Sequence, residues 1–388
     1  MAIYVGEIEK ATKGYTQAGL NLLMSACVAD IPIQLFPLMS PIRWDDQPRW
    51  ADPLRTHLGK LGVPRDIGLL HHSPSSMEAM PRPGESKHVA VTVIEADTLP
   101  KWIVTALNEG VHSAIVPSEF NREVFQRCGV EVPVHVLPHA CGPWWWEDPV
   151  PAGRAAGYED SYIFYYIGSY NQRKNPEGAL RAFLRAFPEP SPANIFAIKT
   201  GVDAALPIRD AMDGRTVVPV ADRIAKVVEE ETGSTAERPD IWTFTGEWSE
   251  AQIRWLHSIG DCCVSLHRGE GFGLVPMQAK LLGNPVIYTD WSSVPEFCSP
   301  EDGDRPVSYK LAQIRSMDVW AYPHFLGRDG EILRWAEPDL DAAATVMADC
   351  ADAKTGGLVG DRLAAYRDRF SWATLGQRLG EILAEIRQ

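Results

Sequence analysis

Short apolar runs alternate with amphipathic stretches along most of the chain. The apolar runs cover residues 2–6, 31–38, 66–72, 88–95, 113–118 and 132–139 in the first half, and 161–169, 194–200, 240–246, 261–267 and 284–290 in the second. Stretches with apolar residues at helical spacing lie between them, notably 19–29, 121–128, 176–186, 250–258 and 276–282. This alternation is typical of βα units and predicts an α/β fold with parallel sheets.

A segment rich in Pro, Gly and Ala, residues 141–160, interrupts this rhythm and is typical of a linker. The chain has 388 residues, more than one hydrophobic core usually serves. We therefore expect two domains, residues 1–150 and 151–370. An amphipathic final helix, residues 371–388, either caps the second domain or crosses back to the first, and we favour the crossing. We expect residues 202–238 to form a helix with exposed loops, and we assign no function to them.

The charge of the chain narrows its partners. Lys and Arg total 37 against 51 Asp and Glu, a net charge of -14. Such a field repels polyanions, so it disfavours nucleic acid and anionic membranes without excluding them. No stretch reaches the ~20 unbroken apolar residues of a membrane helix. The seven cysteines are odd in number, scattered and without a CxxC pair, which favours reduced thiols in a cytoplasmic protein.

The sharpest chemical signal is a glycine-rich turn, residues 269–273, between a predicted strand and a predicted helix. Glycines before a helix leave backbone N–H groups facing an anion, and the helix dipole helps to hold it. Glu270 stands at the tip of this turn, where a carboxylate can accept hydrogen bonds from sugar hydroxyls. The combination suits a phosphorylated sugar, and a plain structural turn is the alternative.

Residues 270–290, EGFGLVPMQAKLLGNPVIYTD, resemble the donor-site signature of the large family of retaining GT-B glycosyltransferases that use nucleotide sugars (glycosyl transferases group 1). Residues 93–143, 167–183, 261–273 and 369–379 resemble other parts of the same family in the same order. The resemblance implies two Rossmann-like, doubly wound domains facing a cleft, with the nucleotide sugar on the second and the acceptor on the first.

On the donor side, the resemblance implies that Glu270 binds the hydroxyls of the sugar. It also implies that the diphosphate or the sugar is bound by Gly271 and by the backbone N–H groups of Phe272, Gly273 and Leu274. Gln278 stands where relatives carry a second Glu for the ribose. A glutamine amide still accepts and donates one hydrogen bond but loses the charge.

Lys174 lies in a predicted strand-to-helix loop, where a cation can neutralise the charge on the departing diphosphate. Relatives carry an Arg directly after a glycine, and here that position is Ser169. We expect Arg173 to take its place from the loop, and a solvated basic pair is the alternative.

In the first domain, residues 14–19 resemble the family's glycine loop, with Gly14, Tyr15 and Gly19 on the acceptor side. Glu95 ends a predicted strand near the reacting centre, where many relatives have a His, and a helix-capping role is equally open. His71 and His139 are further acceptor-side candidates, although a hydrogen-bonded structural histidine is the commoner case.

The run Trp144-Trp145-Trp146 allows sugar stacking, but we favour hydrophobic packing between domains. Asp45, Asp46 and Asp290 lack a histidine at metal-ligand spacing, so we predict no metal and no cofactor. The predicted function is transfer of a sugar from a nucleotide diphosphate sugar to an acceptor hydroxyl with retention of configuration. The alternatives are an inactive nucleotide-sugar or glycan binder and a sugar-nucleotide epimerase. Donor, acceptor and oligomeric state stay open.

Overall fold

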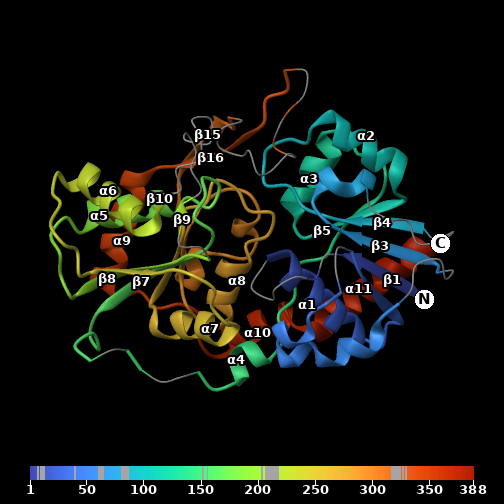
Figure 1. Ribbon diagram of the computed structural model, residues 1–388, viewed down its shortest axis with the longest axis horizontal. Helices are drawn as coiled ribbons and strands as arrows, with labels where there is room; N and C mark the ends of the chain where they lie inside the picture. The colour runs from blue at the N-terminus through green and yellow to red at the C-terminus, as the bar shows by residue number, and fades with distance from the viewer. Residues whose placement is uncertain are drawn as a thin grey trace. The chain divides into compact units, whose positions relative to one another are not determined.

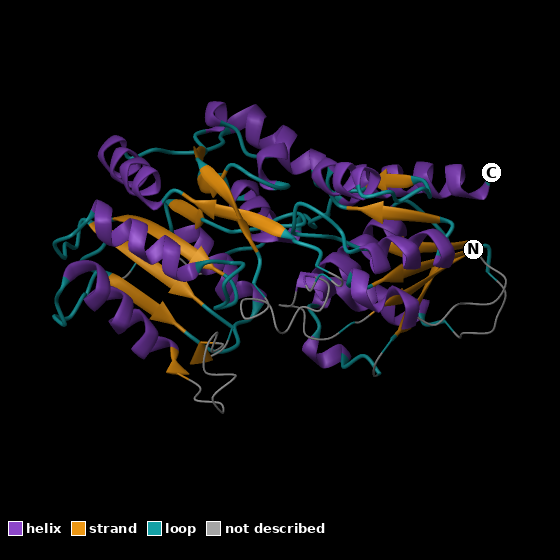
Figure 2. Cartoon of the chain, turned by 90° about the horizontal axis from the view of Figure 1, so that it is seen from above, coloured by secondary structure: helices purple, strands orange, loops and turns teal. Residues whose placement is uncertain are grey.

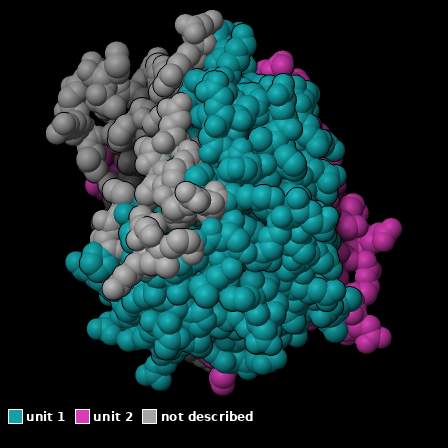
Figure 3. All heavy atoms as spheres, turned by 90° about the vertical axis from the view of Figure 1, so that its right-hand side faces the viewer, with its two compact units in different colours: residues 1–148, 322–333, 364–388 teal, residues 149–321, 334–363 magenta. Residues whose placement is uncertain are grey.

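The computed structural model describes residues 1–6, 8, 14–38, 41–59, 65–79, 87–150, 153–154, 156–201, 204–205, 218–315, 325, 327 and 330–388. The chain forms two compact units. Unit 1 comprises residues 1–148, 322–333 and 364–388, and unit 2 comprises residues 149–321 and 334–363. The residues of unit 1 form one continuous body although three chain segments supply them (Figure 3).

Unit 1 is built on a six-stranded parallel sheet of order β2-β1-β3-β4-β5-β6. Its strands are β1 (Ala2–Gly6), β2 (Ile33–Pro37), β3 (Ile67–His71), β4 (Lys87–Val91), β5 (Ser113–Val116) and β6 (Val134–Val136). Its helices are α1 (Gly14–Val28), α2 (Lys101–Gly110), α3 (Glu119–Arg127), α4 (Trp144–Glu147) and α11 (Trp372–Arg387). Helices α1 and α11 cover one face of the sheet, and α2 and α3 cover the other (Figure 1).

Unit 2 repeats the plan with a parallel sheet of order β11-β8-β7-β12-β13-β14. Its strands are β7 (Tyr162–Ile167), β8 (Asn194–Lys199), β11 (Ile241–Phe244), β12 (Cys262–Ser265), β13 (Val286–Thr289) and β14 (Arg305–Val307). Its helices are α5 (Pro176–Ala186), α6 (Val220–Thr232), α7 (Glu250–Ile259), α8 (Leu274–Leu281) and α9 (Leu340–Ala353), and α10 (Gly360–Arg369) passes from unit 2 into unit 1. Helices again flank both faces of the sheet (Figure 2).

Two antiparallel pairs complete the described structure. They are β9 (Ala204–Ala205) with β10 (Val218–Pro219), and β15 (Tyr309–Gln313) with β16 (Arg334–Pro338). Short 3-10 helices cover Trp44–Asp46, Arg49–His57, Pro74–Ala79, Val294–Glu296 and Pro300–Asp302. Of the segment 202–238, α6 is the predicted helix, and residues 202–203 and 206–217 lie outside the described part.

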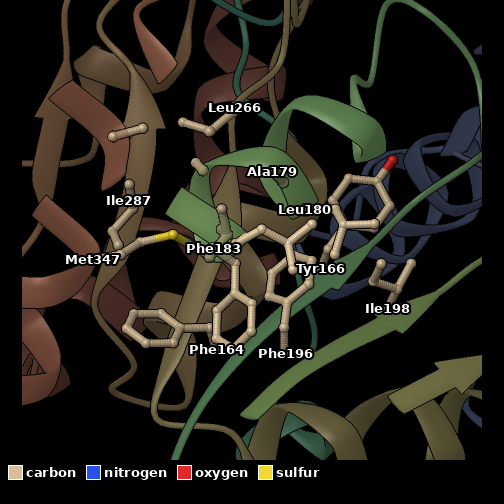
Figure 4. Close-up of a cluster of buried hydrophobic side chains, with 14 of the residues drawn as sticks. Phe164, Tyr166, Ala179, Leu180, Phe183, Phe196, Ile198, Leu266, Ile287 and Met347 are labelled. Atoms are coloured by element: carbon tan, nitrogen blue, oxygen red, sulfur yellow. The ribbon is translucent and has the colours of Figure 1, made fainter. Parts of the chain in front are cut away.

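The core of unit 2 shows why its apolar runs form strands. Phe164 of β7 packs edge-on against Phe183 of α5, and Phe183 lies in turn against Phe196 of β8 (Figure 4). Phe183 stacks on Phe196 with ring centroids 5.3 Å apart. All but one position in each of β7 and β8 is buried, so both faces of these strands are covered and their sequences are nearly continuous apolar runs. The predicted α/β architecture is confirmed.

Helix α1 differs from the prediction at its start. Residues 14–19, expected as a loop before a helix, are the first turns of the helix itself. The helix lies against β1 because position 19 is a glycine: a Cβ there would be 2.1 Å from the Tyr4 hydroxyl oxygen. The glycine thus serves close packing rather than a turn.

Candidate functional site

Two loops of unit 2 meet at the carboxyl edge of its sheet. We call residues 168–175, between β7 and α5, the cation loop, and residues 266–273, between β12 and α8, the glycine loop. Strands β7 and β12 are neighbours, while the chain continues from β7 to β8 on the other side. This is the switch point of the sheet, where open α/β folds bind ligands.

An ion cluster joins the loops. The Glu270 side chain is 8% exposed, and its Oε1 lies 2.5 Å from Lys174 Nζ. Its Oε2 lies 3.4 Å from Arg173 Nη1, which also donates to the carbonyl of Gly269 at 2.8 Å. The three residues predicted from separate segments are therefore in direct contact. Lys174 is the most open of them, with 27% of its side chain exposed.

The electrostatics of the cluster favour the charged carboxylate. Burial raises the pKa of Glu270, but the charges of Lys174, Arg173 and His267 outweigh it and lower the pKa to about 2. Glu270 is therefore ionised at neutral pH. A buried carboxylate with two cations can accept hydroxyl donors, and the partly open ammonium of Lys174 can meet an anion.

Asn175 fixes the end of the cation loop. It adopts the left-handed region at φ 56° and caps α5 by accepting from the Gly178 N–H at 3.2 Å. Its Nδ2 donates to the carbonyl of Leu266 at 2.9 Å, which ties the cap to the glycine loop. Asparagine tolerates this backbone region, so the sequence Asn-Pro starts the helix sharply and places Lys174 one residue before the cap.

The glycine loop ends in the predicted turn. Gly273 precedes α8 at φ 96°, a region that favours glycine. The Ser293 hydroxyl donates to the carbonyls of Glu270 and Phe272 at 2.9 and 2.8 Å. Phe272 also packs on Phe297, with ring centroids 5.2 Å apart. The first turn of α8, with Leu274, thus begins from a fixed loop that includes Gly271, Phe272 and Gly273.

Two residues beneath Glu270 were not predicted. Ser292 holds the left-handed region at φ 64°, and its Oγ accepts from the Glu270 N–H at 3.2 Å. The same oxygen lies 3.3 Å from His267 Nε2. His267 is buried, and burial lowers its pKa although the charge of Glu270 raises it. Serine at a strained position is a signal only the backbone shows, whereas His267 stands three residues before Glu270 in the sequence.

The remaining donor-side candidates lie in the same unit. Ser169 is exposed at the start of the cation loop, and its carbonyl accepts from the Tyr166 hydroxyl at 3.0 Å. Gln278 is buried on α8, with 6% of the residue exposed.

The acceptor-side candidates form a second group, in unit 1. The ring of Tyr15 lies 5.3 Å from that of His71 and stacks on His72 at 6.2 Å. His71 Nδ1 forms a hydrogen bond with the Tyr4 hydroxyl, which also adjoins Gly19. Gly14, by contrast, is exposed at the start of α1.

His71 and His139 line the same cavity of about 20 Å³ in unit 1. Burial lowers the pKa of His71 to about 3 and that of His139 to about 4, so both imidazoles are neutral at pH 7. The cavity is otherwise largely apolar, with Thr92 and Ser25 as its other polar residues. Neutral imidazoles can donate or accept a hydrogen bond there, but they supply no positive charge.

Glu95 lies elsewhere than expected. Strand β4 ends at Val91, four residues earlier, so the prediction that Glu95 ends a strand is wrong. The chain leaves the sheet because the Ile94 N–H donates to Asn121 Oδ1 at 2.6 Å instead of to a neighbouring strand. Glu95 is half-buried in the segment that follows.

The tryptophan run packs within unit 1. Trp145 is fully buried in α4, and Trp144 stacks on Trp50 with ring centroids 5.5 Å apart. The Arg367 guanidinium lies 5.6 Å from the ring of Trp146. Packing, rather than an open sugar platform, accounts for these contacts.

The described residues offer neither a candidate metal site nor a candidate membrane span. No group of three or more His, Cys, Asp or Glu side chains among them is placed to hold a metal ion. None of the described helices combines the length and the apolar character that crossing a membrane requires.

No protein-family model matches the chain, and no curated protein matches it in sequence. Solved structures match its fold. HepE from Anabaena, in complex with UDP and glucose, has a TM-score of 0.63 at 12% identity and covers 99% of this chain and 100% of its own. Sucrose-phosphate synthase from Thermosynechococcus elongatus gives 0.65 at 14%, covering 100% and 99%. A glycosyltransferase from Rickettsia africae gives 0.61 at 11%, covering 99% and 98%.

The chain has the GT-B fold. The predicted fold class is confirmed over the whole length of the chain, and its two doubly wound units correspond to the two Rossmann-like domains of GT-B proteins. At identities of 12% and 14%, the likeness establishes the architecture and not the activity.

Proposed function

We propose that the chain is a retaining glycosyltransferase that transfers a sugar from a nucleotide diphosphate sugar to an acceptor hydroxyl. The observation that carries the proposal is the contact of Glu270 with Lys174 and Arg173 at the switch point of unit 2. The fold is shared with HepE, solved with UDP and glucose, and with sucrose-phosphate synthase. On this proposal the chain belongs to the glycosyltransferase family whose donor signature it resembles.

The donor side supplies two kinds of group. Glu270 accepts hydrogen bonds from the hydroxyls of the donor sugar, because its lowered pKa keeps it ionised. Lys174 and Arg173 neutralise the charge that grows on the departing diphosphate. Backbone N–H groups of Phe272, Gly273 and Leu274 add further donors at the start of α8. Gln278 contacts the ribose without a charge.

The acceptor side supplies position rather than charge. Unit 1 orients the acceptor hydroxyl through Tyr15 and neutral His71, with His139 and Glu95 as further candidates. The hydroxyl attacks the anomeric carbon on the face that the nucleotide leaves, and the leaving phosphate takes its proton. The protein then contributes orientation and charge stabilisation, without a covalent intermediate. We further propose that the enzyme is cytoplasmic and works without a bound metal ion.

A thermal-shift panel tests the proposal. The purified protein is melted with the UDP, GDP, ADP and TDP sugars, with and without EDTA. A ligand at about 100 times its Kd stabilises the fold by roughly 2.7 kcal/mol, which shifts the melting temperature measurably. We expect one nucleotide series to raise the melting temperature, and Glu270→Ala to remove only the part due to the sugar.

Three outcomes lead away from the proposal. No shift with any nucleotide contradicts donor binding in unit 2. A shift without release of nucleoside diphosphate in the presence of pooled hydroxyl acceptors indicates an inactive binding protein. Conversion of the nucleotide sugar into an epimer indicates the epimerase alternative.

A further inference from the structure

Arg268 joins the glycine loop to two other parts of unit 2, the cation loop and β16. It lies in the glycine loop, two residues before Glu270, and 14% of its side chain is exposed. Its Nη1 donates to the Gln172 carbonyl at 2.5 Å and to Gln172 Oε1 at 3.0 Å, in the cation loop. Its Nε and Nη2 reach both carboxylate oxygens of Glu337, in β16, at 2.7 and 2.8 Å.

The backbone of Arg268 repeats these connections. Its N–H donates to the carbonyl of Arg173 at 2.7 Å, and its carbonyl accepts from the Ala336 N–H at 2.9 Å. The ring of Trp335, buried in β16, lies 5.9 Å from the guanidinium carbon. One residue therefore binds the cation loop on one side and β16 on the other, through both its main chain and its side chain.

From this geometry we infer that Arg268, held by Glu337, is a positioning residue that sets the spacing between the Lys174 ammonium and the Glu270 carboxylate. The inference rests on the proposed function, since it gives that spacing a role in transfer. Gln172 and Arg173, which Arg268 holds, immediately precede Lys174 in the chain. The bidentate pair with Glu337 fixes the direction of the guanidinium, because an arginine fork meets a carboxylate in one plane.

Other connections between the loops do not replace this one. The Asn175 amide joins the loops at Leu266, and Arg173 donates to Gly269. Both of these contacts lie within the two loops, and Ser292 and Ser293 hold the glycine loop from the segment after β13. Arg268 adds an attachment to a strand outside the loops, because its side chain binds Glu337 and its carbonyl accepts from the Ala336 N–H, both in β16. The two substitutions below alter the side-chain attachment and leave the backbone bond to Ala336 in place. Orientation errors of about 1 Å in a reacting site cost about 100-fold in rate.

The test compares the variants Glu337→Gln and Arg268→Lys with a variant of a second bidentate pair, which lies elsewhere in unit 2 and is more deeply buried. Glu337→Gln keeps the shape of the side chain and removes its charge, and Arg268→Lys keeps the charge and loses the fork. The control is Asp240→Asn, which breaks the bidentate pair of Arg238 and Asp240, with contacts at 2.9 and 2.6 Å. Asp240 directly precedes β11, so it lies at the amino end of a strand on the border of the unit 2 sheet, whereas the two loops lie at the carboxyl ends of β7 and β12.

Two readouts separate positioning from general stability. Amide hydrogen exchange is followed in peptides covering residues 168–175 and 266–273, and kcat and KM are measured with the nucleotide sugar that the panel identifies. We expect both Arg268 and Glu337 variants to speed exchange in these peptides by at least about 10-fold. We expect kcat to fall about 10-fold to 100-fold while the Kd for the nucleoside diphosphate changes less than about 3-fold. Asp240→Asn should lower the melting temperature without either effect.

Unchanged exchange in both variants, or the same exchange in Asp240→Asn, overturns the inference. So does an unchanged kcat in both variants of an active enzyme. If the wild-type protein turns over no nucleotide sugar, the proposed function fails, and the exchange experiment still decides whether Arg268 positions the two loops.

Discussion

At the scale of single residues, the site depends on charges brought together from distant positions. Lys174 and Glu270 are 96 residues apart in sequence, yet Nζ and Oε1 are 2.5 Å apart. The glycine turn in the sequence predicted Glu270, and the basic pair predicted Lys174 and Arg173. Their mutual contact did not follow from either pattern, because it depends on the pairing of β7 with β12. Ser292 and Arg268 were not predicted for the same reason, because each acts through a tertiary contact.

Lys174→Ala should lower kcat by about 100-fold to 1,000-fold, the cost of removing one preorganised group that stabilises developing charge. Binding of the acceptor should change little, because Lys174 lies in unit 2. Steady-state kinetics with the identified donor measures both. Lys226→Ala is the control, since Lys226 is an exposed lysine on α6 of the same unit. Equal kcat values for Lys174→Ala and the wild type would remove Lys174 from the mechanism.

His71 makes a prediction about pH. Burial lowers its pKa from 6.5 to about 3, so the unfolded chain binds the proton more readily than the folded one. The folded state therefore loses stability as the pH falls below 6.5, and the loss continues until the pH approaches about 3. Between about pH 7.5 and about pH 5, this single group costs about 2 kcal/mol.

His71→Asn places a polar amide group near the Tyr4 hydroxyl, and this amide does not titrate. Urea unfolding at the two pH values should therefore show a smaller drop in the variant than in the wild type, by that amount. An equal drop in both proteins would mean that His71 is protonated in the folded state at pH 5.

At the scale of elements, helix packing decides where glycine is required. Helix α11 lies along α1 in unit 1 (Figure 1). A Cβ at Gly376 would be 2.2 Å from the Ser25 carbonyl oxygen on α1, whereas one at Gly380 would meet nothing closer than 3.6 Å. The amphipathic spacing of apolar residues predicted the helix, but Gly376 and Gly380 have the same intrinsic helix propensity. Only the packing distinguishes them.

Gly376→Ala should destabilise the protein by about 1–3 kcal/mol, because the helices must separate or bend. Gly380→Ala should stabilise it by up to about 1 kcal/mol through helix propensity. Chemical denaturation of the two variants measures these opposite effects. Destabilisation by both to the same extent would contradict the close approach of α11 to α1.

At the scale of the whole molecule, the sequence was sufficient for the architecture. The range predicted for α5, 176–186, matches the observed Pro176–Ala186, because Asn-Pro at its start and the apolar stripe along it mark the helix locally. The strands of the unit 1 sheet, and β7, β8, β11, β12 and β13 of the unit 2 sheet, were predicted because both faces of each sheet are covered, which leaves nearly continuous apolar runs. The edge strand β14, Arg305–Val307, was not predicted, because three residues with an arginine and a proline make no apolar run. The membership of residues 322–333 in unit 1 was not predicted, since no local pattern shows which unit an intervening segment joins.

On the proposed function, the chain transfers a sugar from a nucleotide diphosphate sugar with retention. The most direct measurement is proton NMR of each α-linked nucleotide sugar during incubation with the protein, with and without pooled hydroxyl acceptors. We expect release of nucleoside diphosphate from one donor, an α-anomeric proton in the first product formed, and loss of both in Glu270→Ala. An initial β-anomer would contradict retention, and no release from any donor would contradict glycosyl transfer.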